Sequence, residues 1–140
     1  MYANAQGVPQ NVAEAMRWFR LAANQGNAAA QYSLGVIFAE GKGVSQNFGE
    51  AVSWYRLAAN QGNTIAQYNL GLMYTNGQGV SQNDAEAVRW FRKAAEQGHA
   101  IAQSNLGLMF ANGKGVQQNS AEALKWYRLA ANQGNGLAGC

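Results

Sequence analysis

Side chains able to carry out chemistry are sparse in this chain, and they do not cluster. His99 is the only histidine, and Cys140 is both the only cysteine and the last residue. A zinc site needs about four nitrogen, sulfur or carboxylate ligands, and nucleophilic catalysis needs a serine or cysteine beside an oriented base. Serines such as Ser33, Ser53 and Ser104 are spread along the chain with no obvious base and orienting group. We therefore expect no catalytic residue, no metal ligand set and no cofactor, and we expect the protein not to be an enzyme.

Two glycine-rich segments with a lysine could suggest a phosphate-binding loop. Lys42 stands in EGKGVS and Lys114 in NGKGVQ. A phosphate-binding loop needs G-x-x-x-x-G-K-[ST] between a strand and a helix, and the middle copy of this segment has Gln78 in place of the lysine. We interpret these glycines as helix ends followed by a turn.

Tryptophans recur in the phrase W-[YF]-R-[LK]-A-A and could stack on sugars or bases. Each tryptophan lies at helical spacing from the alanine pair that follows it, so it shares their helix face. We interpret the tryptophans as core residues that fill the space between successive helix pairs, and we expect Arg56 of the same phrase to point toward solvent. The four tryptophans are Trp18, Trp54, Trp90 and Trp126.

The charge of the chain limits the classes of partner. Charged residues make up 12% of the sequence and the net charge is +3, with the basic residues spread along the chain. Binding to nucleic acid usually needs clustered basic residues that neutralise phosphates, so we expect no nucleic-acid partner. No apolar run approaches the length that spans a bilayer, so we expect no membrane insertion.

The sequence repeats itself every 36 residues. The segments that start at Gln46 and Gln82 agree at most positions without an insertion. Such a period is typical of stacked helical repeats. We predict one repeat array over residues 1–140, with units 10–45, 46–81 and 82–117 and partial units 1–9 and 118–140.

Each unit is predicted to form two helices. The first helix begins with N-x-x-E, as in Asn47 and Glu50, which predicts a capping box in which the glutamate reaches back to the cap. Gly62 is placed where this helix ends, and Asn63, like Asn27 and His99, is predicted to cap the second helix. A glycine is predicted to end each second helix in turn, at positions Gly41, Gly77 and Gly113.

These patterns resemble a known family. The phrases A-x-x-W-[YF]-x-x-A-A-x-Q-G and A-Q-x-x-L-G-x-x-[YF]-x-x-G-x-G-V are similar to the Sel1-like repeat, a relative of the tetratricopeptide repeat. The resemblance implies an all-α, right-handed α-solenoid of about seven helices. It also implies a non-catalytic adaptor or scaffold, often bacterial, with a periplasmic or secreted location favoured.

The resemblance further implies a binding surface. In tetratricopeptide repeats ligands lie along the concave side of the superhelix, and we expect a protein or peptide partner there. Some of the matching positions could instead pack between helices, and Tyr32 and Tyr68 are the better candidates for contact. For these two, we predict that substitution by alanine abolishes binding with little change in stability. The matching residues are Tyr32, Val36, Ile65, Tyr68, Leu72, Ile101, Ser104 and Leu108, flanked by Ala29, Ala39, Thr75 and Ala111.

Other readings stay open. Residues 1–9 align with the end of a second helix and the chain stops soon after Asn135, which suggests a fragment or an engineered, consensus-like array without a natural partner. Helices without a cap at the two ends could meet head to tail and produce self-association. A hydrolase is a third alternative, although the repeated cysteines of disulfide-rich relatives are absent here.

Overall fold

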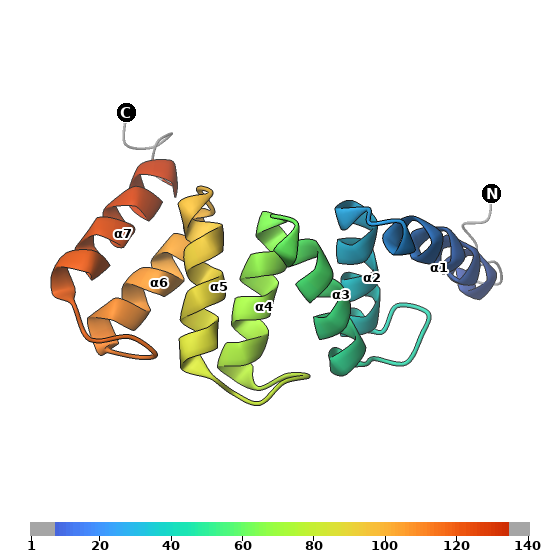
Figure 1. Cartoon of the computed structure of the whole chain (residues 1–140), viewed down its shortest axis with the longest axis horizontal. Helices are drawn as coiled ribbons and strands as arrows, with labels where there is room; N and C mark the ends of the chain where they lie inside the picture. The colour runs from blue at the N-terminus through green and yellow to red at the C-terminus, as the bar shows by residue number, and fades with distance from the viewer. Residues whose placement is uncertain (1–7, 135–140) are drawn as a thin grey trace.

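The computed structural model describes residues 8–134, and this part of the chain forms seven α-helices and no strand. They stand in one row, in chain order from α1 at one end to α7 at the other (Figure 1). We call the odd-numbered helices first helices and the even-numbered ones second helices. The helices are α1 (Val8–Asn24), α2 (Ala28–Glu40), α3 (Phe48–Asn60), α4 (Thr64–Asn76), α5 (Asp84–Glu96), α6 (Ala100–Asn112) and α7 (Ser120–Gly134). The prediction of an all-α helical solenoid is confirmed.

The second helices begin and end where the sequence predicts. The side chains of Asn27 and Asn63 accept hydrogen bonds from backbone N–H groups at 2.9 Å, and His99 Nδ1 accepts one from Ala102 at 3.1 Å. A glycine in the left-handed conformation ends each of these helices, with φ of 68° at Gly41 and similar values in the next two units. This conformation is strained for residues with a Cβ atom, which explains why glycine recurs there.

The first helices have only half of the predicted capping box. The Asn47 side chain accepts a hydrogen bond from the backbone N–H of Glu50 at 3.0 Å, and Asn83 and Asn119 do the same in later units. The backbone N–H of Asn47 donates to the carbonyl of Phe38 at 2.9 Å, so this donor is already satisfied by the preceding second helix. The prediction that the glutamates return to the cap is therefore wrong.

All glutamates of this motif except Glu50 pair with a basic residue one turn later. Glu86 lies 3.6 Å from Arg89, and Glu122 lies 3.4 Å from Lys125. The first copy departs further, because α1 already begins at Val8 and continues through the expected cap position. Pro9 is compatible with this early start, since the first turn of a helix does not use its N–H groups. The predicted partial unit 1–9 and residues 135–140 lie largely outside the described part of the chain.

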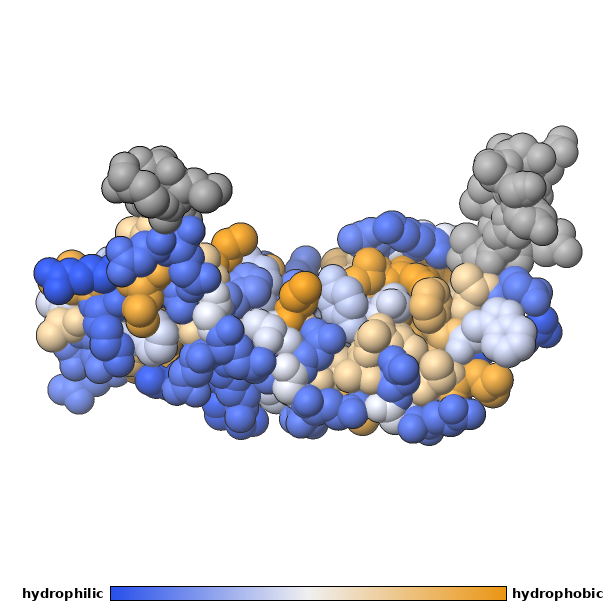
Figure 2. All heavy atoms as spheres, turned by 90° about the horizontal axis from the view of Figure 1, so that it is seen from above, coloured by the Kyte–Doolittle hydropathy of each residue, from blue (hydrophilic) through white to orange (hydrophobic). Residues whose placement is uncertain are grey.

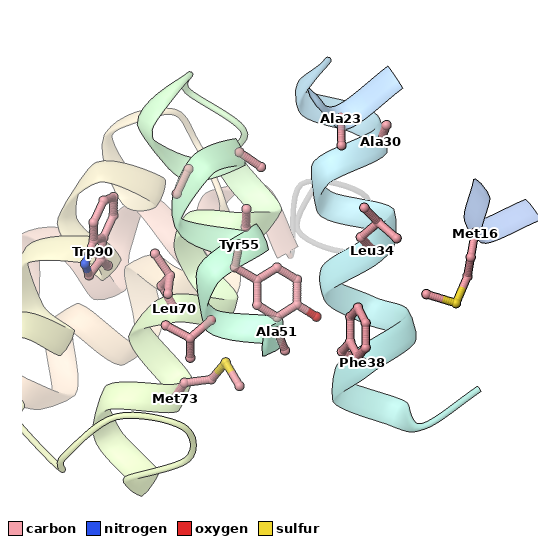
Figure 3. Close-up of a cluster of buried hydrophobic side chains, with 14 residues drawn as sticks. Met16, Ala23, Ala30, Leu34, Phe38, Ala51, Tyr55, Leu70, Met73 and Trp90 are labelled. Carbon is pink, nitrogen blue, oxygen red and sulfur yellow. The ribbon is translucent and has the colours of Figure 1, made fainter. Parts of the chain in front are cut away.

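Each second helix packs more extensively against the first helix that follows it than against the one before it. Gly35, Gly71 and Gly107 make this close approach possible. A Cβ atom at Gly35 would lie 2.5 Å from the ring of Tyr55, and one at Gly71 would lie 2.6 Å from the ring of Phe91. Figure 3 shows the Tyr55 ring extending from α3 toward α2, which carries Leu34 and Phe38. The glycine of the L-G phrase in one unit therefore leaves room for the aromatic ring on the first helix of the next unit.

Buried glutamines connect successive repeats. Gln67 donates from Nε2 to the carbonyl of Ala59 at 3.1 Å, and its Oε1 accepts from Gln97 of the next unit at 2.7 Å. The same two bonds recur one unit earlier and one unit later. We call this series the glutamine ladder; its members are Gln31, Gln61, Gln67, Gln97, Gln103 and Gln133. A buried amide that is hydrogen-bonded at both its nitrogen and its oxygen favours one register between neighbouring units.

Two of the four tryptophans are buried, as the core prediction requires. Trp90 is 2% exposed and Trp126 is also buried, whereas Trp54 is half-buried and Trp18 is 62% exposed. Trp18 lies on α1, which has no second helix before it in residues 8–134, so its ring lacks the surface that covers Trp90. The prediction of a core role is therefore wrong for Trp18 in the described structure.

The expectation for the arginine of the tryptophan phrase is also wrong. Arg56 is half-buried, lies over the ring of Tyr74 at 5.8 Å and donates to its hydroxyl at 2.9 Å. Arg20 and Arg92 lie over the corresponding rings at 5.7 and 5.4 Å. A guanidinium over an aromatic face is attracted by the ring quadrupole, so this residue links the two helices of one unit.

Candidate functional site

The residues predicted to bind a partner all lie on the second helices, on sides that the repeat core leaves at least partly open. Ile65 is 48% exposed, Ile101 57% and Leu108 53%, and these are large values for aliphatic side chains. Ser104 is exposed as well. The remaining members of the predicted set, all half-buried, are Tyr32, Val36, Tyr68 and Leu72. We call this surface of α2, α4 and α6 the second-helix face.

Both tyrosines of the second-helix face support the following repeat. The Tyr32 ring lies 5.9 Å from the buried ring of Tyr55, and the Tyr68 ring lies 5.9 Å from that of Phe91. Tyr68 also stacks on the cap residue His99, with ring centroids 4.7 Å apart. Aromatic pairs of this kind add about 0.5–1.5 kcal/mol each. The expectation that their removal leaves stability unchanged therefore no longer holds, and Ile65 and Ile101 are better sites for substitution.

His99 is a helix cap rather than part of a reactive group. Because its Nδ1 accepts a backbone N–H, the ring must be neutral with its proton on Nε2. Burial lowers the pKa of His99 below its usual range, which favours the same neutral form. Within the described residues, no three His, Cys, Asp or Glu side chains come together in a way that could hold a metal ion.

A groove interrupts the second-helix face between α4, α5 and α6. Its volume is about 200 Å³. The buried ring of Phe91 belongs to its lining, with Leu72 on α4 and Leu108 on α6. The other lining residues are Thr75, Asn105, Met109, Asn112 and Lys114.

The second-helix face carries almost no charge. The helices α4 and α6 contain no Asp, Glu, Lys or Arg, and α2 contains only Glu40 at its end. Glu40 pairs with Lys42 at 3.0 Å. Among the described ion pairs none involves Lys114, whose side chain is exposed at the edge of the groove.

A second hollow, of about 330 Å³, lies beside one rung of the glutamine ladder. Its lining includes Gln67 and Gln97, whose amides already bond to each other, and the buried Trp90. Lys93 and Glu96 bring opposite charges to the same rim. The Nε1 atom of Trp90 is buried there without a hydrogen-bond partner among the described residues.

A row of exposed leucines on the first helices was not predicted from the sequence. Leu21, Leu57 and Leu129 are 54%, 47% and 41% exposed, and Lys93 takes the corresponding place in α5. The signal was the residue after the arginine in each W-[YF]-R phrase. Lys93 divides this row of leucines, so the leucines do not form a continuous apolar stripe.

Seen from above, the described surface is mostly hydrophilic, with hydrophobic residues gathered toward the α1 end (Figure 2).

None of the helices in residues 8–134 is long and apolar enough to cross a membrane. The helices instead bury their apolar residues against one another, as a stacked array requires.

Comparison with known proteins identifies the repeat. The model of the Sel1 repeat family matches residues 1–27, 28–63, 64–99 and 100–135. The last three matches each span one 36-residue period and begin at a second helix, so each of them contains one of the closely packed helix pairs. No curated protein matches the chain.

Solved structures agree with the family assignment. A protective antigen of uropathogenic Escherichia coli strains with an SLR fold is 46% identical, with a TM-score of 0.83 over 88% of this chain and 26% of that protein. A Sel1 repeat protein from Oxalobacter formigenes is 42% identical, with a TM-score of 0.78 over 96% of this chain and 58% of that protein. This chain thus spans about a quarter and somewhat over half of these two relatives. The cysteine rich protein B of Helicobacter pylori, 23% identical, shares the fold with a TM-score of 0.69 over 91% of both chains.

The repeat length, the helix pairs and the family match agree along the whole array. The chain belongs to the Sel1 repeat family.

Proposed function

We propose that this chain is a non-catalytic interaction scaffold that binds an extended segment of a partner protein across the second-helix face. Sel1 repeat proteins generally act as protein-interaction scaffolds and are generally non-catalytic. The face used and the form of the partner are our additions, and they rest on the surface chemistry of α2, α4 and α6.

The observation that carries this proposal is the exposure of aliphatic side chains on an uncharged surface. Ile65, Ile101 and Leu108 are each about half exposed, and the helices that carry them contain no charged residue. Exposed apolar side chains that recur along a surface are typical of interaction sites. An extended segment that crosses α4 and α6 would contact all three.

A rigid frame stands behind these three residues. The second helices are capped at both ends, and the glutamine ladder fixes their positions from unit to unit. A surface held in its binding geometry loses little conformational entropy when a partner binds. We therefore propose binding without a large rearrangement of the array.

Self-association is the second candidate. The helix α1 exposes Trp18 and Leu21, and α7 exposes Leu124 and Leu129. Inside the described array, however, extensive contacts join a first helix to a second helix. A head-to-tail meeting of α7 with α1 would join two first helices, so it would not repeat an internal contact. Light scattering that gives the monomer mass at every concentration would exclude this candidate.

The proposed function can be tested by selection from a displayed library of random peptides on the full chain. Peptides that are enriched are then measured by fluorescence anisotropy against Ile65→Ser/Ile101→Ser and against Leu57→Ser as a control. Leu57 is 47% exposed, close to the 48% of Ile65, but it lies on a first helix. We expect the double variant to weaken binding about tenfold or more, in line with the loss of central apolar contacts, and the control to leave it unchanged. An equal effect of both variants, or a library without enriched peptides, would contradict the proposal.

A further inference from the structure

We propose that the groove between α4, α5 and α6 anchors one aliphatic side chain of the bound segment, and that an acidic residue next to this side chain contacts Lys114. This inference rests on the proposed function, because it specifies which residue of the partner is recognised on the second-helix face. It follows from the shape of the groove, from the residue that forms its floor and from the charges around it.

The dimensions of the groove suit a single side chain. Ligand pockets for small molecules usually measure about 300–1,000 Å³, and this groove measures about 200 Å³. Phe91, Leu72 and Leu108 provide apolar surfaces from three different helices. An aliphatic side chain that enters between the two leucines removes apolar area of both partners from water.

A difference between repeats gives the groove its apolar floor. In the preceding unit the residue that corresponds to Phe91 is Tyr55, and Asn69 lies beside its hydroxyl. Phe91 has no hydroxyl, so the corresponding Asn105 lacks this neighbour and contributes to the lining of the groove instead. The floor of this unit is thus apolar where that of the previous unit carries a polar atom.

The charges around the groove favour an acidic neighbour of the anchor. The lining contains one cation, Lys114, and no Asp or Glu. The amides of Asn105 and Asn112 add further hydrogen-bond donors. The segment continues over α4 and α6 in the proposed function, so the matching carboxylate belongs to an internal Asp or Glu of the partner and not to its C-terminus.

The direct test is an NMR titration of the 15N-labelled full chain with the pentapeptide Ala-Glu-Leu-Glu-Ala, acetylated and amidated to remove its terminal charges. We expect shifts of the side-chain amides of Asn105 and Asn112 and of the Lys114 backbone. Replacing the central leucine of the peptide by alanine should remove these shifts, and replacing its glutamates by glutamine should weaken binding about two- to fivefold, as an exposed ion pair would. No groove-centred shift up to about 10 mM peptide, the limit of weak specific binding, would overturn the inference.

Two variants that borrow residues from a neighbouring repeat make the test specific. Phe91→Tyr introduces the hydroxyl that Tyr55 carries at the equivalent position of the preceding unit. Lys114→Gln introduces the same residue type as Gln78, which is the equivalent of Lys114 in that unit. Both should retain the wild-type circular dichroism spectrum and melting midpoint. We expect Phe91→Tyr to weaken binding of the pentapeptide at least about fivefold, because a polar atom enters the apolar floor of the groove. We expect Lys114→Gln to abolish the preference for the glutamate peptide over the glutamine peptide.

The outcomes separate this inference from the proposed function. If library peptides depend on Ile65 and Ile101 but bind both variants as tightly as the wild type, the anchor is refuted and the scaffold function stands. If peptides bind without dependence on Ile65 and Ile101, the proposed face itself is wrong. Groove-centred shifts that either variant leaves unchanged would also overturn the inference.

Discussion

Gly71→Ala provides the sharpest test of how the repeats fit together. Alanine usually stabilises a helix relative to glycine, by about 0.5–1 kcal/mol in the interior. At Gly71, however, the added Cβ would lie 2.6 Å from two ring carbons of Phe91. Ordinary contact begins near 3.4 Å, so the ring or the helix must move by almost 1 Å in a region where Phe91 is 2% exposed.

The magnitude follows from these two opposing effects. Overpacking of a close-packed core costs about 1–3 kcal/mol, which exceeds the gain in helix propensity. We expect a net loss of about 1–2 kcal/mol in the free energy of unfolding of Gly71→Ala. Urea denaturation followed by circular dichroism at the helical band gives this value from the shift of the midpoint at constant slope.

Gly49→Ala is the matched control. Gly49 also lies within a helix, but a Cβ there would meet only the Asn47 side chain at 3.4 Å, and three other units carry alanine at this position. We expect this variant to gain about 0.5 kcal/mol, because Gly49 is in the first turn of α3. If Gly71→Ala were also stabilising, the close approach of Gly71 and Phe91 would not limit the packing of the repeats, and our reasoning would be refuted.

Three further measurements test other parts of the structure. Gln67→Ala should cost about 1–3 kcal/mol in urea denaturation, because it removes two hydrogen bonds of a buried side chain, each of which contributes about 0.5–1.5 kcal/mol; unchanged stability would mean that the ladder contributes nothing. Trp90→Ala should cost about 3–5 kcal/mol while Trp18→Ala stays within about 0.5 kcal/mol, and similar losses would contradict their different burial. Because burial lowers the folded-state pKa of His99, its contribution to stability is complete above the unfolded pKa of about 6.5 and is lost as pH falls through the folded pKa. Melting midpoints should therefore fall with pH more steeply in the wild type than in His99→Asn, and parallel curves would show that the cap does not titrate.

Local sequence signals were sufficient for the helices themselves. Asn63 and Gly77 mark the start and the end of α4 by chemistry that acts within a few residues. The 36-residue period then predicted the array, since identical units can bury their apolar residues only against one another. Fold class and the positions of the helices after α1 were therefore predictable without knowledge of tertiary contacts.

Features that depend on the distance between helices were not predictable. Arg56 was expected to point toward solvent. Its ring partner, Tyr74, is 18 residues away on the next helix, so the local sequence does not reveal the contact. Glu50 was expected to complete a capping box because the competing acceptor, the carbonyl of Phe38, belongs to the preceding helix. The groove was missed for the same reason, since Leu72, Phe91 and Leu108 meet only after three helices are packed.

The glutamine ladder has a direction, and this has a consequence for how such a chain can change in length. Each Gln of the second helix donates within its own helix pair and accepts from the pair that follows, as Gln67 does with Ala59 and Gln97. Inserting or deleting a whole unit of 36 residues returns every donor to an equivalent acceptor, whereas any other length leaves a buried amide without its counterpart. A tandem duplication of the gene segment is thus structurally neutral only when it adds whole repeats. The glutamine ladder therefore restricts the array to a whole number of units.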